Sequence, residues 1–338
     1  MKAVGYAAVG PIDRPDALID FEAPDPRPGP RDLLVRVQAI SVNPVDAKIR
    51  SRRAPEGGAP AILGWDAVGE VVETGAEATL FRPGDQVWYA GAIDRPGANS
   101  ELHVVDERIV GRKPESVSNA AAAALPLTTL TAHEMLFDRL RVGDPAPGAA
   151  RALLLIGAAG GVGSITIQLA RALSDLDVIA TASRPETQAW ARDLGAQHVI
   201  DHSAPLPAQV AALGLDAPPP YVFSTNRTEL YVDQIAEVIA PQGRFGLIDD
   251  PESVDIKPFK AKSVSIHWEL MYTRSLFQTP DMARQGEILN EAAALIDAGR
   301  IVTTATASMG AISAENLTRA HALIESGTAK GKLVLEGF

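Results

Sequence analysis

The sequence predicts an α/β fold in two parts, a doubly wound parallel sheet and a second, β-rich domain, on three observations. The first 125 or so residues hold short β-branched runs such as "DLLVRVQAISVNP" and "AVGEVVETG", with Gly or Pro near most of their ends. From Ala152 onward, strand-like and helix-like segments alternate. Beyond about residue 265 this alternation stops, and the chain closes on the strand-like "KLVLEGF".

The short runs of the first part are typical of antiparallel strands joined by tight turns, and they favour a barrel-like or sandwich domain. "RPGDQVW" (82–88) has the form of a turn that enters a strand. Alanine-rich, helix-favouring sequence begins near "SNAAAAALPLTTLTAHEML". The linker-like stretch "GDPAPGAA" (143–150) precedes the alternating part, so a domain boundary is expected near it.

The alternating part begins with "ALLLI" (152–156), a continuous apolar run that predicts a strand buried on both faces. A helix is expected in "SITIQLARAL", a strand in "DVIATA", and a helix in "RPETQAWARDLG", with Pro185 near its start and Gly195 past its end. "HVID", "YVFST" and "GRFGLI" continue the series of strands. Repeated βα units predict a parallel, doubly wound sheet.

Composition limits the class of function. The 338 residues carry a net charge of -11, which disfavours a broad nucleic-acid or anionic-membrane surface, so we expect neither as a partner. No cysteine is present, which excludes disulfides, thiolate metal sites and a cysteine nucleophile. The N-terminus does not resemble a signal peptide, and no apolar run approaches the roughly 20 residues of a membrane span. A cytoplasmic protein is expected.

The segment "GAAGGVGS" after the strand at 152–156 predicts a dinucleotide-binding loop. Unpaired N–H groups at a helix N-terminus bind anions, and glycines let the backbone approach a pyrophosphate. Ala158 replaces the first glycine of the usual G-x-G-x-x-G pattern, and the preceding glycine is expected to take the tight turn. A packing loop without a ligand is the alternative. The residues predicted to contact the cofactor are Gly157, Ala159, Gly160, Gly161, Val162 and Gly163.

The residues after the next strand predict NADP(H) rather than NAD. About 20 positions after the glycines, where an acidic residue would hold the ribose of NAD, the sequence has Ala182, followed by Ser183 and Arg184. A hydroxyl and a guanidinium suit a 2′-phosphate, which a carboxylate would repel. The alternatives are that Ser183 is the N-cap of the next helix and that Arg184 is a solvated surface charge.

Six motifs fall in one order along essentially the whole chain: "SVNPVDAKIRS", "LGWDAVGEVVETG", "RPGDQVW", "LPLTTLTAHEML", "AAGGVGSITIQLAR" and "LGAQHVIDH". In this order they resemble the medium-chain dehydrogenase/reductase superfamily and its quinone oxidoreductase branch. "HWELMYTRSLFQTPDM" is similar to a marker of the zinc-type alcohol dehydrogenase-like subgroup. The resemblance implies a GroES-like barrel domain at 1–125, a Rossmann domain at 126–265 and a segment at 266–338 that returns to the barrel domain. It also implies an active site between the domains and a homodimer.

The resemblance comes with a departure from the zinc enzymes. Their catalytic zinc is held by a Cys, a Gly-His-Glu segment and a further Cys or Asp. The matching positions here are Asn43, Gly64-Trp65-Asp66 and a site near Leu125. Zinc requires three or four N, S or O ligands, and Asp66 alone does not supply them. The cysteine-rich structural zinc lobe is missing too, so no metal is expected.

Without a zinc ion to act as a Lewis acid, oxidation of an unactivated alcohol becomes difficult. Quinones and α,β-unsaturated carbonyls are easier acceptors, because they spread the negative charge of an arriving hydride over a conjugated system. A few oriented hydrogen bonds then stabilise that charge. The sequence therefore predicts an NADPH-dependent, zinc-independent reductase of quinones or α,β-unsaturated carbonyls.

Five residues are candidates for the reacting end of the site. Asn43, at the first ligand position, offers two amide donors, although it is also an ordinary turn residue. Lys48 stands where several relatives have a tyrosine and faces either the cleft or solvent. Thr129 is expected to contact the nicotinamide or the substrate oxygen, and the alternative is that it only starts a helix. Trp65 and Trp268 are predicted to wall the pocket, with Trp65 alternatively filling the vacated metal space.

The remaining cofactor contacts are placed by the resemblance alone. His202 is expected near the adenosine end and Ser224 near a cofactor ribose. The backbone groups of Leu247 and Ile248 are expected at the carboxamide. For Lys330 and Lys332 the expectation is a contact to cofactor phosphates, with a solvated pair as the alternative.

Two other functions remain open at the sequence level. One is a zinc-type, NADP-dependent alcohol dehydrogenase, which the missing ligands disfavour. The other is an NADPH-binding structural or RNA-associated protein with little catalysis. The acidic composition argues against RNA.

Overall fold

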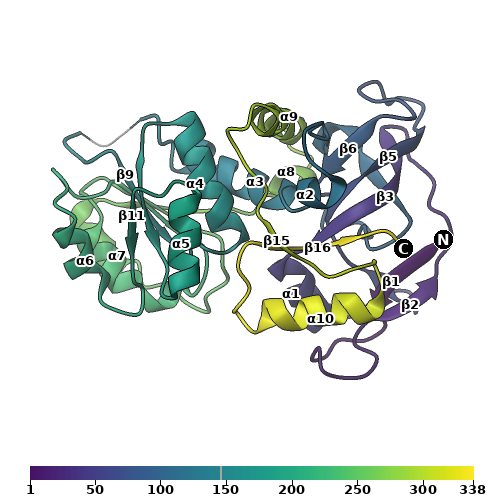
Figure 1. Ribbon diagram of the computed structural model, residues 1–338, viewed down its shortest axis with the longest axis horizontal. Coiled ribbons are helices and arrows are strands. Elements are labelled where there is room, and N and C mark those ends of the chain that lie inside the picture. The colour runs from purple at the N-terminus through teal and green to yellow at the C-terminus, as the bar shows by residue number, and fades with distance from the viewer. Residues whose placement is uncertain (145–146) are drawn as a thin grey trace. The chain divides into compact units, whose positions relative to one another are not determined.

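The computed structural model describes residues 1–144 and 147–338, and the chain divides into two compact units (Figure 1). Unit 1 comprises Met1–Leu130 and Tyr272–Phe338, and unit 2 comprises Thr131–Met271. The sequence placed these boundaries at 125/126 and 265/266. The linker predicted at 143–150 falls inside unit 2, and its residues 145 and 146 lie outside the described residues.

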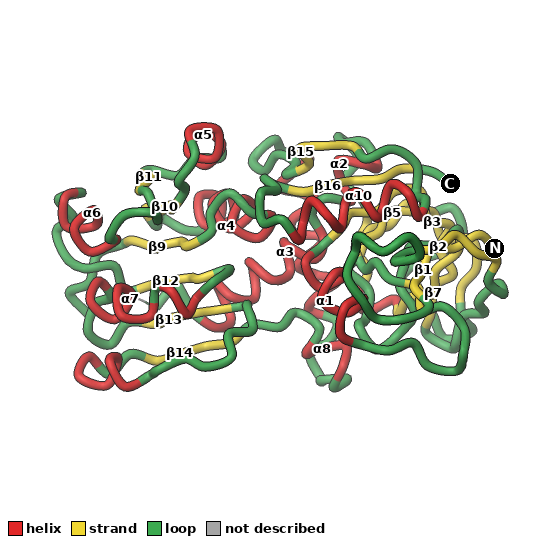
Figure 2. Tube along the Cα trace, turned by 90° about the horizontal axis from the view of Figure 1, so that it is seen from below, coloured by secondary structure: helices red, strands yellow, loops and turns green. Residues whose placement is uncertain are grey.

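Unit 2 contains the doubly wound sheet. Six strands of its described part lie in the order β11-β10-β9-β12-β13-β14, and every neighbouring pair is parallel (Figure 2). The order reverses between β9 and β12, which is where ligands bind in open α/β sheets. The predicted fold class is thereby confirmed, but β14, beyond the predicted alternation, was missed. The strands are β9 (Ala152–Ile156), β10 (Asp177–Thr181), β11 (His198–Ile200), β12 (Tyr221–Ser224), β13 (Arg244–Leu247) and β14 (Ser265–Trp268).

Helices cover both faces of this sheet, as the continuous apolar run of β9 requires. Leu154 and Ile156 belong to a core with Val210 of α6 and Ile235 of α7, so these two helices cover one face (Figure 1). On another strand, a Cβ at Gly246 of β13 would meet the Met135 sulfur, so η2 packs directly on the sheet. The helices are α4 (Gly161–Leu173), α5 (Pro185–Asp193), α6 (Leu206–Ala212), α7 (Val232–Val238), the π-helix η2 (Glu134–Arg139), and the 3₁₀ helices η3 (Thr228–Leu230) and η4 (Lys257–Lys262).

Unit 1 is the β-rich unit. Its larger sheet has the order β15-β16-β3-β5-β6-β8, with β7 also paired to β3, and a smaller antiparallel sheet has the order β2-β1-β4. The strands are β1 (Lys2–Tyr6), β2 (Ile19–Glu22), β3 (Asp32–Val42), β4 (Ala61–Ile62), β5 (Asp66–Thr74), β6 (Gln86–Tyr89), β7 (Leu102–Asp106), β8 (Val110–Arg112), β15 (Ala305–Ser308) and β16 (Lys332–Glu336). The helices are α1 (Pro44–Arg52), η1 (Glu107–Ile109), α2 (Asn119–Ala123), α3 (Pro126–His133, which crosses the unit boundary), α8 (Thr273–Leu276), α9 (Arg284–Asp297) and α10 (Ala314–Glu325).

The C-terminal strand β16 joins this sheet beside β3 and brings residues from the two ends of the chain together (Figure 2). The two strands are antiparallel, and Leu333 pairs with Val42. The register therefore brings the preceding residue, Lys332, opposite Asn43, although almost the whole chain separates the two in sequence.

Candidate functional site

The glycine loop between β9 and α4 is shaped by two close backbone approaches. Gly157 has φ of +80°, and a Cβ there would lie 2.3 Å from the Thr225 hydroxyl oxygen. A Cβ on Gly163 would lie 2.4 Å from the Gly157 carbonyl oxygen and 2.6 Å from the Ala158 Cα atom. By contrast, the nearest atom to a Cβ on Gly160 would be 3.5 Å away. Gly157 and Gly163 are therefore needed by the fold, whereas Gly160 leaves room above the backbone.

This open backbone fits a pyrophosphate. Gly160 is the N-cap of α4, and no side chain of the described residues caps the helix. Gly161 and Val162, in the first turn, are only partly buried, as is Ala159 in the loop. The first N–H groups of a helix lack intrahelical partners and attract anions. The predicted loop residues thus form one cradle at the carboxyl end of β9.

Ser183 and Arg184 follow β10 at the same edge of the sheet, because the strands are parallel. Both are partly exposed. Arg184 occupies the N-cap position of α5, so Ser183 is not the N-cap. The Arg184 guanidinium lies 3.1 Å from the Glu186 carboxylate, with 42% of its side chain exposed. A partly exposed cation thus stands beyond β10, where NAD-binding folds hold their acidic residue.

Other predicted contacts lie at the same carboxyl edge, but not all are equally accessible. Ser224, at the end of β12, is buried and accepts a hydrogen bond of 2.8 Å from Thr228. The Leu247 carbonyl accepts a bond of 3.1 Å from the Glu269 N–H, whereas Ile248 is partly exposed. His202, after β11, is partly exposed as well. Of these groups, Ile248 and His202 are the more open to a ligand.

Trp268 ends the edge strand β14, and 59% of its surface is exposed. Its indole N–H donates to the Asp249 carbonyl at 3.3 Å. This exposure leaves its predicted role as a pocket wall untested.

The predicted contact of Lys332 with cofactor phosphates is wrong. The lysine side chain is buried in unit 1, with 2% of the residue exposed. Its ammonium donates to the Val42 carbonyl at 2.9 Å, to Asn43 Oδ1 at 2.5 Å and to Asp66 Oδ2 at 3.1 Å. An ammonium has three protons, and these three oxygens account for all of them, so none remains for a phosphate. Lys330, two residues earlier, is partly exposed and keeps its predicted role as a proposal.

Asp66 is the anion of this cluster and is fully buried. Besides Lys332, its Oδ2 accepts from the Ser41 hydroxyl and from the Asn43 Nδ2, each at 2.7 Å. Its Oδ1 accepts from the Leu127 N–H at 2.7 Å, at the first turn of α3. The carboxylate thus joins the end of β3, the start of β5, β16 and α3.

Asn43 and Asp46 form the start of α1. The Asn43 N–H donates to Asp46 Oδ2 at 2.6 Å, the reciprocal half of a capping box, and Pro44 occupies the first helical position. Asp46 is buried, and this burial raises its pKa to about 7, against the opposing effect of the Asn43 hydrogen bond. Asn43 is both a turn residue, as the alternative had it, and a member of the buried cluster.

Two buried hydroxyls in unit 1 have no hydrogen-bond partner among the described residues: those of Thr129 and Tyr272. Burial, with the nearby carboxylates of Asp46 and Asp66, raises the pKa of Tyr272 well above its ordinary value, so the phenol stays protonated. Tyr272 was not identified from the sequence, where nothing in the local pattern distinguishes it from a core aromatic residue. An unpartnered buried hydroxyl is unusual and calls for a ligand or water.

Trp65 and Lys48 complete the predicted set. Trp65 is buried with 2% exposed, donates to the Ala92 carbonyl at 3.0 Å and meets the Tyr272 ring edge-on at 6.2 Å between centroids. This burial contradicts an open pocket wall, and the alternative, a filler of the vacated metal space, stays a prediction. Lys48 is partly exposed on α1.

The residues at the zinc-ligand positions do not fit a zinc ion. Asn43 Oδ1 and Asp66 Oδ2 both accept hydrogen bonds from a cation, the Lys332 ammonium. Position 125 is a buried leucine. Among the described residues, no group of three or more His, Cys, Asp or Glu is arranged to hold a metal. A zinc ion would have to displace Lys332 and would still lack ligands.

A second buried carboxyl group lies in unit 2. Glu269, 3% exposed, follows β14, and its Oε2 is 2.7 Å from the Nε of Arg139. Burial raises the pKa of Glu269 to about 8, and the neighbouring carboxyl of Glu134 adds to this, against the opposing effect of Arg139. Glu134 and Arg139 belong to the π-helix η2, a form of helix that often marks functional segments. The raised pKa therefore predicts that Glu269 holds a proton at neutral pH.

This proton predicts a pH-dependent stability. Between pH 4.5, the ordinary pKa, and about 8, the folded protein holds the Glu269 proton and the unfolded chain does not, so its contribution to stability falls as pH rises through this window. Glu269→Gln carries no such proton. We expect its Tm, relative to the unaltered protein, to improve steadily from pH 5 to pH 8.5. Glu237→Gln, at an exposed glutamate on α7, is the control. Parallel curves for both variants would refute the assignment.

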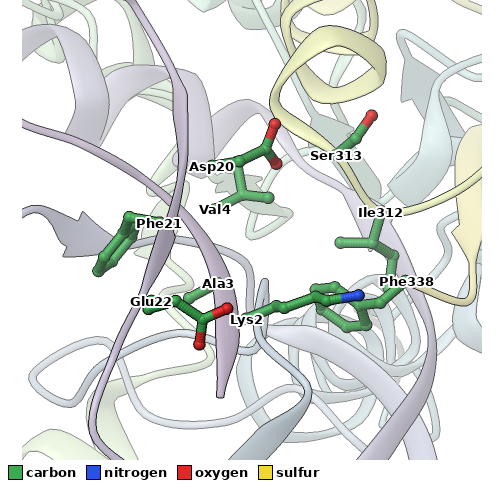
Figure 3. A pocket seen from close by; sticks show the side chains of 9 residues that line it. All are labelled: Lys2, Ala3, Val4, Asp20, Phe21, Glu22, Ile312, Ser313 and Phe338. Carbon is green, nitrogen blue, oxygen red and sulfur yellow. The ribbon is translucent and has the colours of Figure 1, made fainter.

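A cavity of about 440 Å³ lies elsewhere in unit 1, and Figure 3 shows its lining from β1, β2 and the C-terminal end of the chain. None of the predicted site residues lines it. It therefore plays no part in the candidate site. Among the described residues, no helix is both long and apolar enough to cross a membrane.

Comparisons with known proteins agree with this architecture. Residues 29–115 match the alcohol dehydrogenase GroES-like domain, and residues 194–335 match the zinc-binding dehydrogenase family. A zinc-type alcohol dehydrogenase-like protein of Staphylococcus aureus (strain COL) is 38% identical over 337 residues, 99% of each chain. A quinone oxidoreductase of Pseudomonas aeruginosa is 38% identical over 205 residues, 60% of this chain and 59% of that protein.

A solved structure from Rhizobium etli CFN 42, provisionally named a zinc-dependent alcohol dehydrogenase protein, is also similar. It is 58% identical, with a TM-score of 0.98, and the match covers 100% of this chain and 98% of that one. The similarity over the full length, the two domain matches and the observed fold all point to the same family. The chain belongs to the medium-chain dehydrogenase/reductase superfamily of oxidoreductases, among zinc-type alcohol dehydrogenase-like and quinone oxidoreductase relatives.

Proposed function

We propose that the protein is an NADPH-dependent, zinc-independent reductase that transfers a hydride to quinones or α,β-unsaturated carbonyls. The observation that carries the proposal is the Lys332 ammonium, which occupies the oxygens of Asn43 and Asp66 where a catalytic zinc would need its ligands. An enzyme with no Lewis acid for an unactivated alcohol is best suited to an acceptor that is already electrophilic.

When bound, NADPH supplies a hydride and leaves as NADP⁺. The hydride forms a C–H bond at the β-carbon of an enone, the C=C electron pair forms a double bond between the α-carbon and the carbonyl carbon, and the C=O electron pair moves onto oxygen. In a quinone the negative charge ends on a ring oxygen. A proton then adds to that oxygen, or to the oxygen or the α-carbon of the enone product. Among this chain's residues, we propose that Asn43 and Thr129 donate hydrogen bonds to the oxygen that gains charge. Lys48 is the proposed source of positive charge or of the proton.

Cofactor binding is assigned to unit 2. Gly160, Gly161 and Val162 present the N–H groups of α4 to the pyrophosphate, because no side chain of the described residues caps that helix. Arg184 and Ser183 are assigned to the 2′-phosphate, which favours NADPH over NADH. The support is their position beyond β10 together with the partly exposed guanidinium.

The test of the proposal is a substrate panel. NADPH absorbance is followed with 1,4-benzoquinone, 9,10-phenanthrenequinone and simple enones, in the presence of a chelator. Turnover is expected with the conjugated acceptors. Alcohol-dependent reduction of NADP⁺ that needs added zinc would instead identify an alcohol dehydrogenase. Tight NADPH binding without turnover of any acceptor would identify a binding protein with little catalysis.

Arg184→Ala is expected to weaken NADPH binding about 10- to 100-fold, the loss of a charge-assisted hydrogen bond. NADH, which lacks the 2′-phosphate, should bind almost as before. Titration of each cofactor by calorimetry measures the ratio. Arg192→Ala, at an exposed arginine on the same helix, is the matched control. Unchanged NADPH affinity in Arg184→Ala would remove the assignment to NADP(H).

We also propose that the protein is a homodimer. β14 pairs only with β13 among the described strands, so one edge of the sheet in unit 2 is open. Trp268 and Leu270, at the end of that edge, are both more than half exposed. An open edge beside apolar surface favours association with a second copy. Light scattering after size exclusion is expected to give twice the 35.6 kDa of the chain, and a mass of 35.6 kDa would contradict this.

A further inference from the structure

The Lys332 ammonium lies in a site made of three oxygens from two chain segments. The Val42 carbonyl and Asn43 Oδ1 come from the end of β3 and the residue after it, and Asp66 Oδ2 comes from the start of β5. All four residues are buried. One of the three oxygens belongs to a carboxylate, so the site is suited to a single positive charge. Lys332 supplies that charge from a third segment, β16.

The same contacts fix the orientation of the Asn43 amide. An ammonium only donates hydrogen bonds, so the atom that faces Lys332 at 2.5 Å must be Oδ1. The Nδ2 then faces Asp66 Oδ2, to which it donates at 2.7 Å. This uses one of the two amide protons, and no acceptor among the described residues takes the other. Asp66 Oδ2 only accepts hydrogen bonds and favours the same orientation, so Lys332 and Asp66 together exclude the flipped amide.

We propose that Lys332 is a tethered cation in the place of the family's metal ion, and that it is a positioning residue for the Asn43 amide. The cation site stands on the contacts alone. The positioning role rests on the function proposed above, in which the remaining Nδ2 proton hydrogen-bonds to the acceptor oxygen during hydride transfer. Lys332 itself does not touch the acceptor, because its three protons are already used.

The proposal is tested by chemical rescue. Lys332→Ala removes the cation but leaves the three oxygens and a space in which a small amine fits. Tm, NADPH affinity, and kcat and KM for a quinone are measured in ammonium chloride, methylammonium chloride and tetramethylammonium chloride at equal ionic strength. Tetramethylammonium has the charge but no N–H donor. Lys2→Ala, at an exposed lysine of the same unit, is the control for general effects of lysine removal.

The variant is expected to lose about 10 °C in Tm, from one broken buried ion pair, and about 10- to 100-fold in kcat, from a misplaced donor. NADPH affinity should not change. Ammonium and methylammonium should restore Tm and kcat along the same saturable curve, and tetramethylammonium should not. Equal effects of all three salts, or equal effects on Lys332→Ala and Lys2→Ala, would overturn the cation site.

Lys332→Gln keeps most of the side chain's length and an N–H donor without the charge, and it serves as the test if the alanine variant does not fold. Its kcat is expected to fall with unchanged NADPH affinity, and no amine should rescue it, because the space stays filled. An unaltered kcat would overturn the positioning role. If the unaltered protein reduces no quinone or enone, the proposed function fails, yet recovery of Tm by ammonium would still establish the cation site.

Discussion

Asp66→Ala is expected to lower the free energy of unfolding by about 3–5 kcal/mol, because it leaves the Lys332 ammonium buried without its counter-charge. The same change removes the acceptor for Ser41, Asn43 and the Leu127 N–H, all at 2.7 Å in the structure. Urea denaturation followed by fluorescence measures the loss. Asp66 is fully buried, so solvent cannot replace the missing interactions at small cost.

A matched double variant separates charge from packing. Asp66→Asn with Lys332→Met removes both charges and keeps both side chains close to their original size. It is expected to recover most of the stability that Asp66→Ala loses, since an apolar or neutral replacement of a buried pair is often tolerated. If Asp66→Ala costs less than about 1 kcal/mol, within the range of an exposed ion pair, the cluster is not buried in solution.

Gly163→Ala and Gly160→Ala are expected to fail in different ways. A methyl group at 163 would lie 2.4 Å from the Gly157 carbonyl oxygen, so the loop must shift, at a cost of about 1–3 kcal/mol. At 160 the nearest atom would be 3.5 Å away, so stability should stay within about 0.5 kcal/mol. The methyl at 160 would instead occupy the space proposed for the pyrophosphate and should weaken NADPH about 10- to 100-fold.

Thermal unfolding and NADPH titration of the two variants, side by side, check this pair of expectations. Stability lost at 160, or NADPH affinity retained there, would show that the loop packs against protein and holds no phosphate. A Gly163→Ala variant with unchanged Tm would mean that α4 does not approach the Gly157 carbonyl as closely as the structure has it.

Local patterns were sufficient to predict the fold class. The buried run at 152–156, the glycines after it and the alternating helices each depend on neighbours in sequence, and the structure has them as β9, the loop and α4. The strand at 265–268 is not predicted, because the strand–helix alternation of the sequence ends near residue 265, whereas β14 pairs in parallel with β13 at the edge of the sheet.

The contacts of the buried cluster around Asp66 could not be predicted from local sequence patterns. Lys332 was assigned to cofactor phosphates by the resemblance, which places a basic residue near the end of the chain. Its true neighbours follow from the pairing of Leu333 with Val42, a register between strands that are far apart in sequence. Tyr272 and the Glu269–Glu134 pair were missed for the same reason, since their unusual environments come from burial by distant segments.

The central claim is that hydride transfer here needs no metal ion, because Lys332 already occupies the oxygens that an ion would use. The most direct test is the zinc content of purified, tag-free protein together with its NADPH-dependent quinone reduction before and after dialysis against a chelator. We predict far less than one zinc per chain and unchanged turnover. Stoichiometric zinc, with activity that is lost on chelation and restored by zinc alone, would contradict the claim.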